Sequence, residues 1–119
     1  MYCVDELEQQ PLIDPDQWGR LQTELGNEML REFSLEFFEE TRETWMVPDF
    51  NPFAFEEKVF KSMAHRSAGA AGTIGFKKLR YAFLCLEHSA LNEHTTRALE
   101  LMNLTFEATQ QWVETTTQS

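Results

Sequence analysis

Residues that start and end helices divide this chain into segments of helix length, and they constrain its fold more than any other feature. Asp14-Pro15 and Asn51-Pro52 each place a capping side chain before a proline, an arrangement typical of helix starts. Gly26-Asn27 and Gly75 supply the glycines at which helices commonly end. The segments between these signals have apolar residues at helical spacing, and no alternating apolar–polar run of strand length occurs. The sequence therefore predicts an all-α fold.

Five helices are expected, and they are joined by short connections. They cover about residues 15–25, 28–45, 53–74, 76–91 and 95–115. The second has an apolar stripe that should face the core, made of Met29, Phe33, Phe37, Thr41 and Trp45. Long helices with short connections are typical of antiparallel bundles. We expect an antiparallel four-helix bundle with an extra short N-terminal helix over residues 13–117, preceded by an N-terminal arm of residues 1–12.

Composition limits the compartment and the partners. The chain has 119 residues and 42% apolar content, enough for one folded domain. No stretch reaches the ~20 apolar residues that a membrane span needs, and the acidic start of the chain does not resemble a signal peptide. Cys3 and Cys85 have no spaced partners and are expected to be reduced thiols, so we expect a cytoplasmic protein. A net charge of −10 argues against nucleic acid or a membrane surface as the partner.

The charge is distributed unevenly along the chain. Between Lys58 and Arg80 there are six bases and no acid, whereas the rest of the chain has a net charge of −16. A run of charge usually marks a solvated helix face. Here its sign opposes that of the whole chain, which favours docking of an anionic group or an acidic surface. Lys77 and Lys78, near the expected helix turn, are candidates for docking charges.

The basic segment contains the stretch AHRSAGAAGTIG, in which a histidine precedes several small residues. A helical wheel assigns the core face of this helix to Val59, Phe60, Met63, Ser67, Ala70, Ala71 and Ile74. His65 then lies on the opposite side, together with Ala68, Gly69 and Gly72. Each glycine inside a helix costs roughly 0.5–1 kcal/mol relative to alanine. Close helix packing is one explanation for them. Their position beside an exposed imidazole favours the other, steric clearance around His65.

These residues resemble the histidine-containing phosphotransfer (HPt) domain of multistep phosphorelays. In that family a histidine is followed by lysine three residues later, glycines four and ten later, leucine fourteen later, and a leucine–acid or leucine–glutamine pair. The matching positions here are His65, Gly69, Gly75, Leu79 and Leu86-Glu87. The resemblance covers about residue 13 to the end of the chain. It implies that His65 accepts a phosphoryl group.

A helix hairpin that turns near residue 76 explains why Glu87 stands at its position. His65 and Glu87 are both eleven residues from that turn, so antiparallel helices would place them opposite each other. Glu87 would then accept a hydrogen bond from Nδ1 of His65 and leave Nε2 facing outward as the nucleophile. The alternative is that Glu87 is an ordinary acid at the edge of the core.

One family position is different, because Ala68 occupies the place of the usual lysine. Lys61 shares the stripe of His65 but leans away from it, and Arg66 lies ~100° around the helix. Neither residue is an obvious replacement for the lysine. The residues considered for electrostatic support or receiver docking are Lys58, Lys61, Arg66, Ala68 and Phe76.

The resemblance implies partners and a reaction. The expected partners are response-regulator receiver domains and a hybrid sensor histidine kinase, with Mg²⁺ held by the receiver and no cofactor on this chain. We expect a monomer. His88 and His94 lack the Glu-x-x-His pairs of a metal-binding bundle, and no ATP-binding glycine loop occurs. The competing hypothesis is a degenerate HPt adaptor that binds receivers without phosphotransfer.

Overall fold

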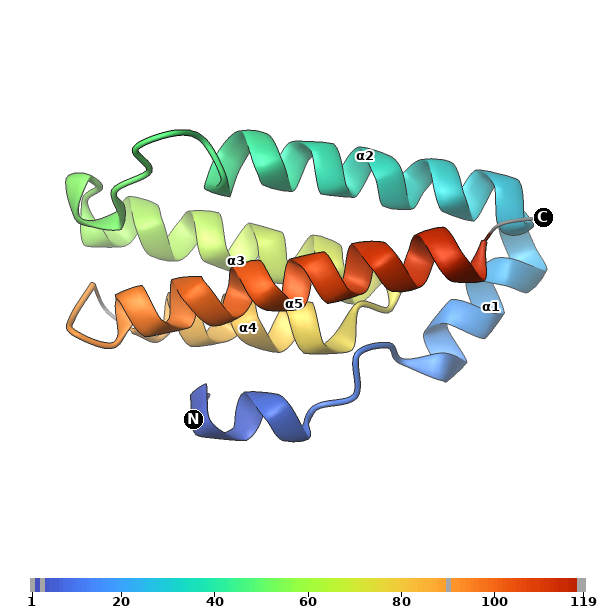
Figure 1. The fold of residues 1–119 in the computed structure, drawn as a ribbon, viewed down its shortest axis with the longest axis horizontal. Helices are drawn as coiled ribbons and strands as arrows, with labels where there is room; N and C mark the ends of the chain where they lie inside the picture. The colour runs from blue at the N-terminus through green and yellow to red at the C-terminus, as the bar shows by residue number, and fades with distance from the viewer. Residues whose placement is uncertain (1, 3, 90, 118–119) are drawn as a thin grey trace.

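The computed structural model describes residues 2, 4–89 and 91–117, and all regular elements in those ranges are helices (Figure 1). The elements are η1 (Val4–Gln9), α1 (Pro15–Leu25), α2 (Asn27–Trp45), η2 (Pro52–Ala54), α3 (Glu57–Ile74), α4 (Lys77–Glu87) and α5 (Thr95–Thr116). The predicted all-α class is confirmed. None of these helices is both long enough and apolar enough to cross a membrane.

Most of the predicted helix boundaries coincide with their sequence signals. The Asp14 carboxylate accepts hydrogen bonds from the backbone N–H groups of Asp16 and Gln17, at 3.1 and 3.2 Å, and so caps α1. Gly75 ends α3 in a left-handed conformation, with φ of 93°. Its carbonyl also accepts a 2.8 Å bond from the Asp14 N–H, which ties the start of α1 to the turn between α3 and α4.

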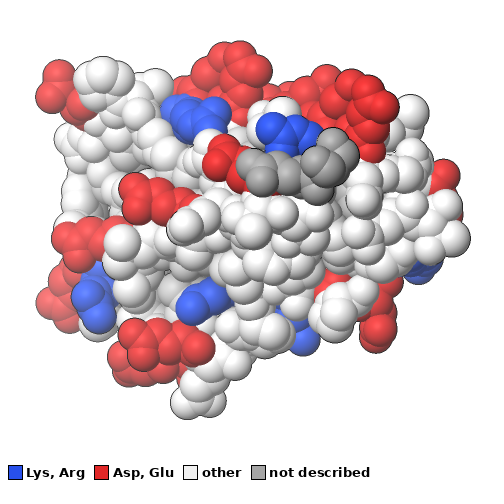
Figure 2. All heavy atoms as spheres, turned by 45° about the vertical axis from the view of Figure 1, so that its right-hand side comes forward, with Lys and Arg blue, Asp and Glu red and all other residues white. Residues whose placement is uncertain are grey.

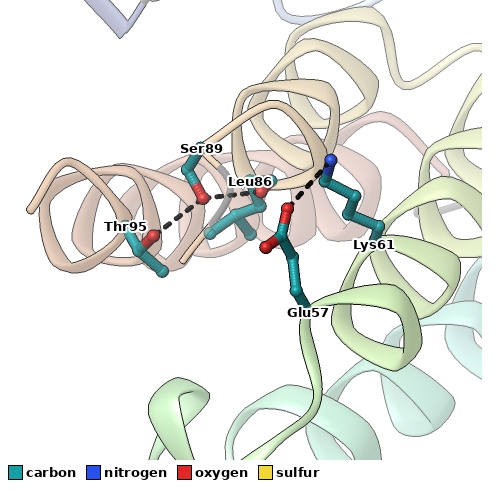
Figure 3. A network of polar contacts seen from close by, with 5 residues as sticks. All are labelled: Glu57, Lys61, Leu86, Ser89 and Thr95. Atoms are coloured by element: carbon teal, nitrogen blue, oxygen red, sulfur yellow. Dashed lines mark hydrogen bonds and ion pairs between the residues drawn. The ribbon is translucent and has the colours of Figure 1, made fainter. Parts of the chain in front are cut away.

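Two predicted boundaries are wrong. Asn51 caps the short 3-10 helix η2 and not α3, which starts later, at Glu57. The cause is Phe55, whose extended backbone (φ −92°, ψ 151°) separates the two helices. The α4 helix ends at Glu87 instead of continuing to residue 91. The Ser89 hydroxyl donates to the Leu86 carbonyl at 2.7 Å and accepts from the Thr95 hydroxyl at 2.8 Å (Figure 3), which stabilises the turn before α5.

The helices pack around an aromatic core. The α3 and α4 helices pack closely, α5 lies against α4 and α2, and η1 lies against α4 and α5. The rings of Phe38 and Phe76 are stacked with their centroids 5.4 Å apart, and Trp45 contacts Phe60 edge-on at 5.6 Å. Leu7 of η1 is buried in the same core, so the described part of the N-terminal arm packs onto the helices.

The predicted core stripes of α2 and α3 are partly wrong. In α2, Met29 and Phe33 are 46% and 45% exposed, and the neighbouring Leu30 and Ser34 are buried instead. In α3, Val59 is 46% exposed. The buried residues of α3 are Phe60, Ala64, Ala68 and Ala71. The wheel placed the core face on the side of Val59 and Ala70, both of which are exposed, whereas Ala64 and Ala68 face the core and α4 packs closely along α3.

Candidate functional site

The centre of the candidate site is an exposed histidine in the middle of α3. The His65 side chain is 73% exposed, whereas that of Glu87, the last residue of α4, is 21% exposed. Nδ1 of His65 lies 3.0 Å from Oε1 of Glu87. The contact that the hairpin register predicts is therefore present in the structure.

This contact determines which nitrogen of the neutral His65 ring carries the hydrogen. An ionised carboxylate can only accept a hydrogen bond, so Nδ1 carries the hydrogen that Glu87 accepts. In the neutral ring, Nε2 then keeps its lone pair. Since most of the ring is exposed, a second protein can reach that nitrogen. The arrangement can thus present one oriented nitrogen nucleophile to an electrophile from outside the chain.

Gly69 and Gly72 have different surroundings. A Cβ atom added at Gly69 would meet nothing within 4 Å, so the helix surface one turn beyond His65 is open. A Cβ at Gly72 would lie 2.9 Å from Cδ of Arg80. The predicted steric clearance is therefore found at Gly69. At Gly72 it is wrong, because the Arg80 side chain occupies that space.

Two predicted support or docking residues are buried, and those predictions are wrong. Ala68 is only 2% exposed and belongs to the packed side of α3, so it does not share the open face of His65. Phe76 is fully buried and stacks on Phe38, because the α3–α4 turn folds back over the core. Neither side chain is accessible to a docked partner.

The three predicted cations on α3 lie in different environments. Lys61 forms an ion pair with Glu57 at 3.2 Å (Figure 3), and both side chains are about half exposed. Arg66 lines a groove between α2 and α3 together with Glu40, so it faces away from Glu87. Lys58 is exposed on the first turn of α3. No described ion pair joins any of them to the His65–Glu87 pair.

The remaining histidines and the cysteines lie elsewhere. His88 follows α4, and its ring contacts that of Tyr2 with a centroid distance of 5.2 Å. His94 precedes α5, and its Nε2 atom lies 3.7 Å from Oε1 of the neighbouring Glu93. Cys85 is buried, and Cys3 lies outside the described residues. Within the part of the chain that the structure describes, no three His, Cys, Asp or Glu side chains are grouped to hold a metal ion.

Sequence reasoning missed two surface features near this site. One is a mostly apolar groove of about 400 Å³ between α1, α2 and α3, beside the exposed Phe33. The other is a cleft that contains Lys77 and Arg80, next to Gly69 and Gly72. The basic run of the sequence pointed to the second feature but did not show which bases share one cleft.

The chain was compared with family models, curated proteins and solved structures. None of them matches it.

Proposed function

We propose that this chain is a histidine phosphotransfer protein, in which α2, α3, α4 and α5 form the four-helix bundle of an HPt domain. The observation that carries the proposal is the His65–Glu87 pair, an exposed imidazole whose Nδ1 is held by a carboxylate 3.0 Å away. The open surface at Gly69 supports it, because a receiver domain must bring its active-site aspartate close to Nε2.

The proposed reaction uses Nε2 of His65 as the nucleophile. It attacks the phosphorus of a phospho-aspartate on the receiver, a P–N bond forms, and the P–O bond to the aspartate breaks. The aspartate leaves as a carboxylate. Because Nδ1 keeps its proton, the ring acquires positive charge, which the Glu87 carboxylate stabilises. Transfer to a second receiver reverses these steps.

The receiver would supply most of the electrostatic stabilisation. Loose phosphoryl-transfer transition states are stabilised by cations around the phosphoryl oxygens. The described cations of this chain do not converge on His65, and Ala68 stands where the family has a lysine. The Mg²⁺ of the receiver would therefore carry that role. The donor would be a receiver attached to a hybrid sensor histidine kinase, in the cytoplasm.

The runner-up function is a receiver-binding adaptor that does not transfer phosphoryl groups. The observation that favours it is the buried alanine at the lysine position. The exposed side chains of Met29 and Phe33 and the apolar groove beside Phe33 suit protein binding under either hypothesis. The two functions differ in one property, which is whether His65 becomes phosphorylated.

The test separates binding from transfer. A panel of purified receiver domains is phosphorylated with acetyl phosphate and mixed with the wild-type chain, with His65→Gln and with His88→Gln. Phosphotransfer predicts that the wild type and His88→Gln take phosphoryl groups from at least one receiver and that His65→Gln does not. Receiver binding without phosphorylation of any of the three proteins would favour the adaptor.

A further inference from the structure

A cleft of about 460 Å³ opens one helical turn beyond His65. It is lined by Gly69 and Gly72 of α3, by Lys77 and Arg80 of α4, and by Asp14 and Gln17 at the start of α1. The cleft therefore begins on the same open surface that a partner must cover in order to reach His65.

The polar groups on the α1 side of the cleft are already engaged. The Asp14 carboxylate caps α1, as described above. The Gln17 side chain donates from Nε2 to the Thr73 carbonyl at 2.7 Å and accepts a hydrogen bond from Arg20. These contacts hold the wall of the cleft in place. They leave the cations of α4 as the groups available to a ligand.

Lys77 and Arg80 are the two cations that line this cleft. Neither side chain forms a hydrogen bond or ion pair with any described residue, although acids outnumber bases twenty to ten in the sequence. Lys77 also lies in the first turn of α4, which contains no acid and has no side-chain cap. Positive charge at that end is unfavourable, because the helix dipole is itself positive there. An incoming anion would relieve this repulsion.

Figure 2 shows the distribution of charged side chains on one face of the molecule. On the face it draws, acidic side chains form several groups, with single basic side chains between them. Since no described acid pairs with Lys77 or Arg80, the cleft favours a partner surface that carries negative charge.

The helix register places the cleft away from the reacting nitrogen. His65 lies opposite Glu87, and Gly72, seven residues further along α3, lies opposite Arg80, seven residues earlier in α4. Seven residues span ~10 Å of helix. Arg80 lies against Gly72, at that distance from the His65–Glu87 pair, so it does not replace the missing lysine. A ligand of the cleft is therefore a different group of the partner from the phosphoryl group that reaches His65.

We propose that Lys77 and Arg80 bind a surface carboxylate, an Asp or Glu side chain, of the receiver domain docked at His65. This inference rests on the proposed function. The phosphoryl group itself travels to Nε2, ~10 Å away, so the anion that reaches the cleft belongs to the partner's surface, and carboxylates are the anions of protein surfaces. The Arg80 guanidinium can bind a carboxylate with two parallel hydrogen bonds, and Lys77 adds a point charge.

The test neutralises both cations with little change in their shape. Lys77→Gln/Arg80→Gln is compared with the wild type and with Arg97→Gln, which removes an exposed cation from α5, outside the cleft. For a receiver that exchanges phosphoryl groups with the wild type, the initial transfer rate is measured across receiver concentrations at low and high ionic strength. We expect the double variant to raise KM about tenfold at low salt with kcat unchanged. The effect should shrink at high salt, and Arg97→Gln should match the wild type.

Three outcomes would overturn the proposal, and they differ from one another. An unchanged KM with normal transfer would reject the cleft and leave the proposed function standing. A lower kcat with unchanged KM would mean that these cations act on the phosphoryl group. Transfer to the wild type from no receiver at all would reject the proposed function and, with it, the cleft. Labelling of each variant with phosphoramidate, which needs no receiver, checks that His65 itself is intact.

Discussion

The Nδ1 atom of His65 lies 3.0 Å from Oε1 of Glu87, and this contact joins the middle of α3 to the last residue of α4. It selects the tautomer of the neutral ring in which Nδ1 carries the hydrogen, on a side chain that is 73% exposed. No described ion pair adds a third charged residue to His65 and Glu87, so the reaction of His65 depends on groups that a docked partner supplies. This relationship yields the first prediction.

Replacing Glu87 should slow phosphorylation of His65. Glu87→Ala removes the acceptor for Nδ1–H and the charge that stabilises the phosphorylated ring, and we expect labelling by phosphoramidate to slow about tenfold. Glu87→Gln keeps an acceptor oxygen and should recover part of the rate. Nitrogen NMR of His65 should also show more of the tautomer protonated at Nε2 in Glu87→Ala. Glu93→Gln, in the turn before α5, is the control and should behave like the wild type.

If the rate and the tautomer populations are the same in Glu87→Ala as in the wild type, Glu87 is an ordinary acid at the edge of the core. That result would remove the orienting role but would leave His65 as a candidate acceptor.

Filling the open surface at Gly69 should block docking without harming the fold. Gly69→Gln places a side chain where an added Cβ meets nothing within 4 Å, and the loss of a glycine inside a helix should stabilise the protein by about 0.5–1 kcal/mol. We expect a higher Tm, together with a sharp fall in transfer from a phosphorylated receiver. Gly19→Gln is a matched control, because Gly19 is also inside a helix with open space around it.

Transfer to Gly69→Gln at the wild-type rate would contradict the clearance role. Phosphoramidate labelling distinguishes blocked receiver docking from damage to His65 itself, because this small donor should still reach His65 when a receiver cannot.

Replacing Ala68 with the lysine that HPt domains have at this position should destabilise this protein. Ala68 is 2% exposed on the packed side of α3, so Ala68→Lys must insert a long charged side chain into a close helix contact. Overpacking of this kind typically costs about 1–3 kcal/mol. Ala70→Lys, two residues away on an exposed part of the same helix, is the control and should change stability little. Urea unfolding measures both variants, and an equal midpoint for both would show that position 68 is open.

Removing the hydroxyl of Ser89 should loosen the turn between α4 and α5. The buried Ser89 hydroxyl bonds to Leu86 and Thr95, so Ser89→Ala leaves the Thr95 hydroxyl without its acceptor, at a cost of about 1–3 kcal/mol. Thr96→Ala, one residue further at an exposed position, is the control. Thermal unfolding should show a lower Tm for Ser89→Ala alone. Equal Tm values would mean that the bond to Thr95 contributes nothing to stability.

The sequence predicted those features that depend on local signals. Asp14-Pro15 and Gly75 act within a few residues of themselves, so the ends of α1 and α3 were predictable. The contact between His65 and Glu87 was predictable for the same reason, because a short turn at Gly75 fixes the register of both helices.

Features that depend on packing between helices were not predictable in this way. The rotation of α3 about its axis is set by the fit of Ala64 and Ala68 into the packed interior, and small side chains give little signal on a hydrophobic wheel. The position of the Arg80 side chain over Gly72 depends on how closely α3 and α4 approach each other. The distance between two helices cannot be calculated from the spacing of residues within one of them.

The central claim is that Nε2 of His65 accepts a phosphoryl group from a receiver aspartate, and direct location of the label tests it. The wild-type chain is incubated with radiolabelled phospho-receivers, separated from them and digested, and the labelled peptide is sequenced. The account predicts an acid-labile, base-stable label on the peptide that contains His65, and no label on the His65→Gln protein. Label on His88 or His94, or no label from any receiver that binds the chain, would contradict it.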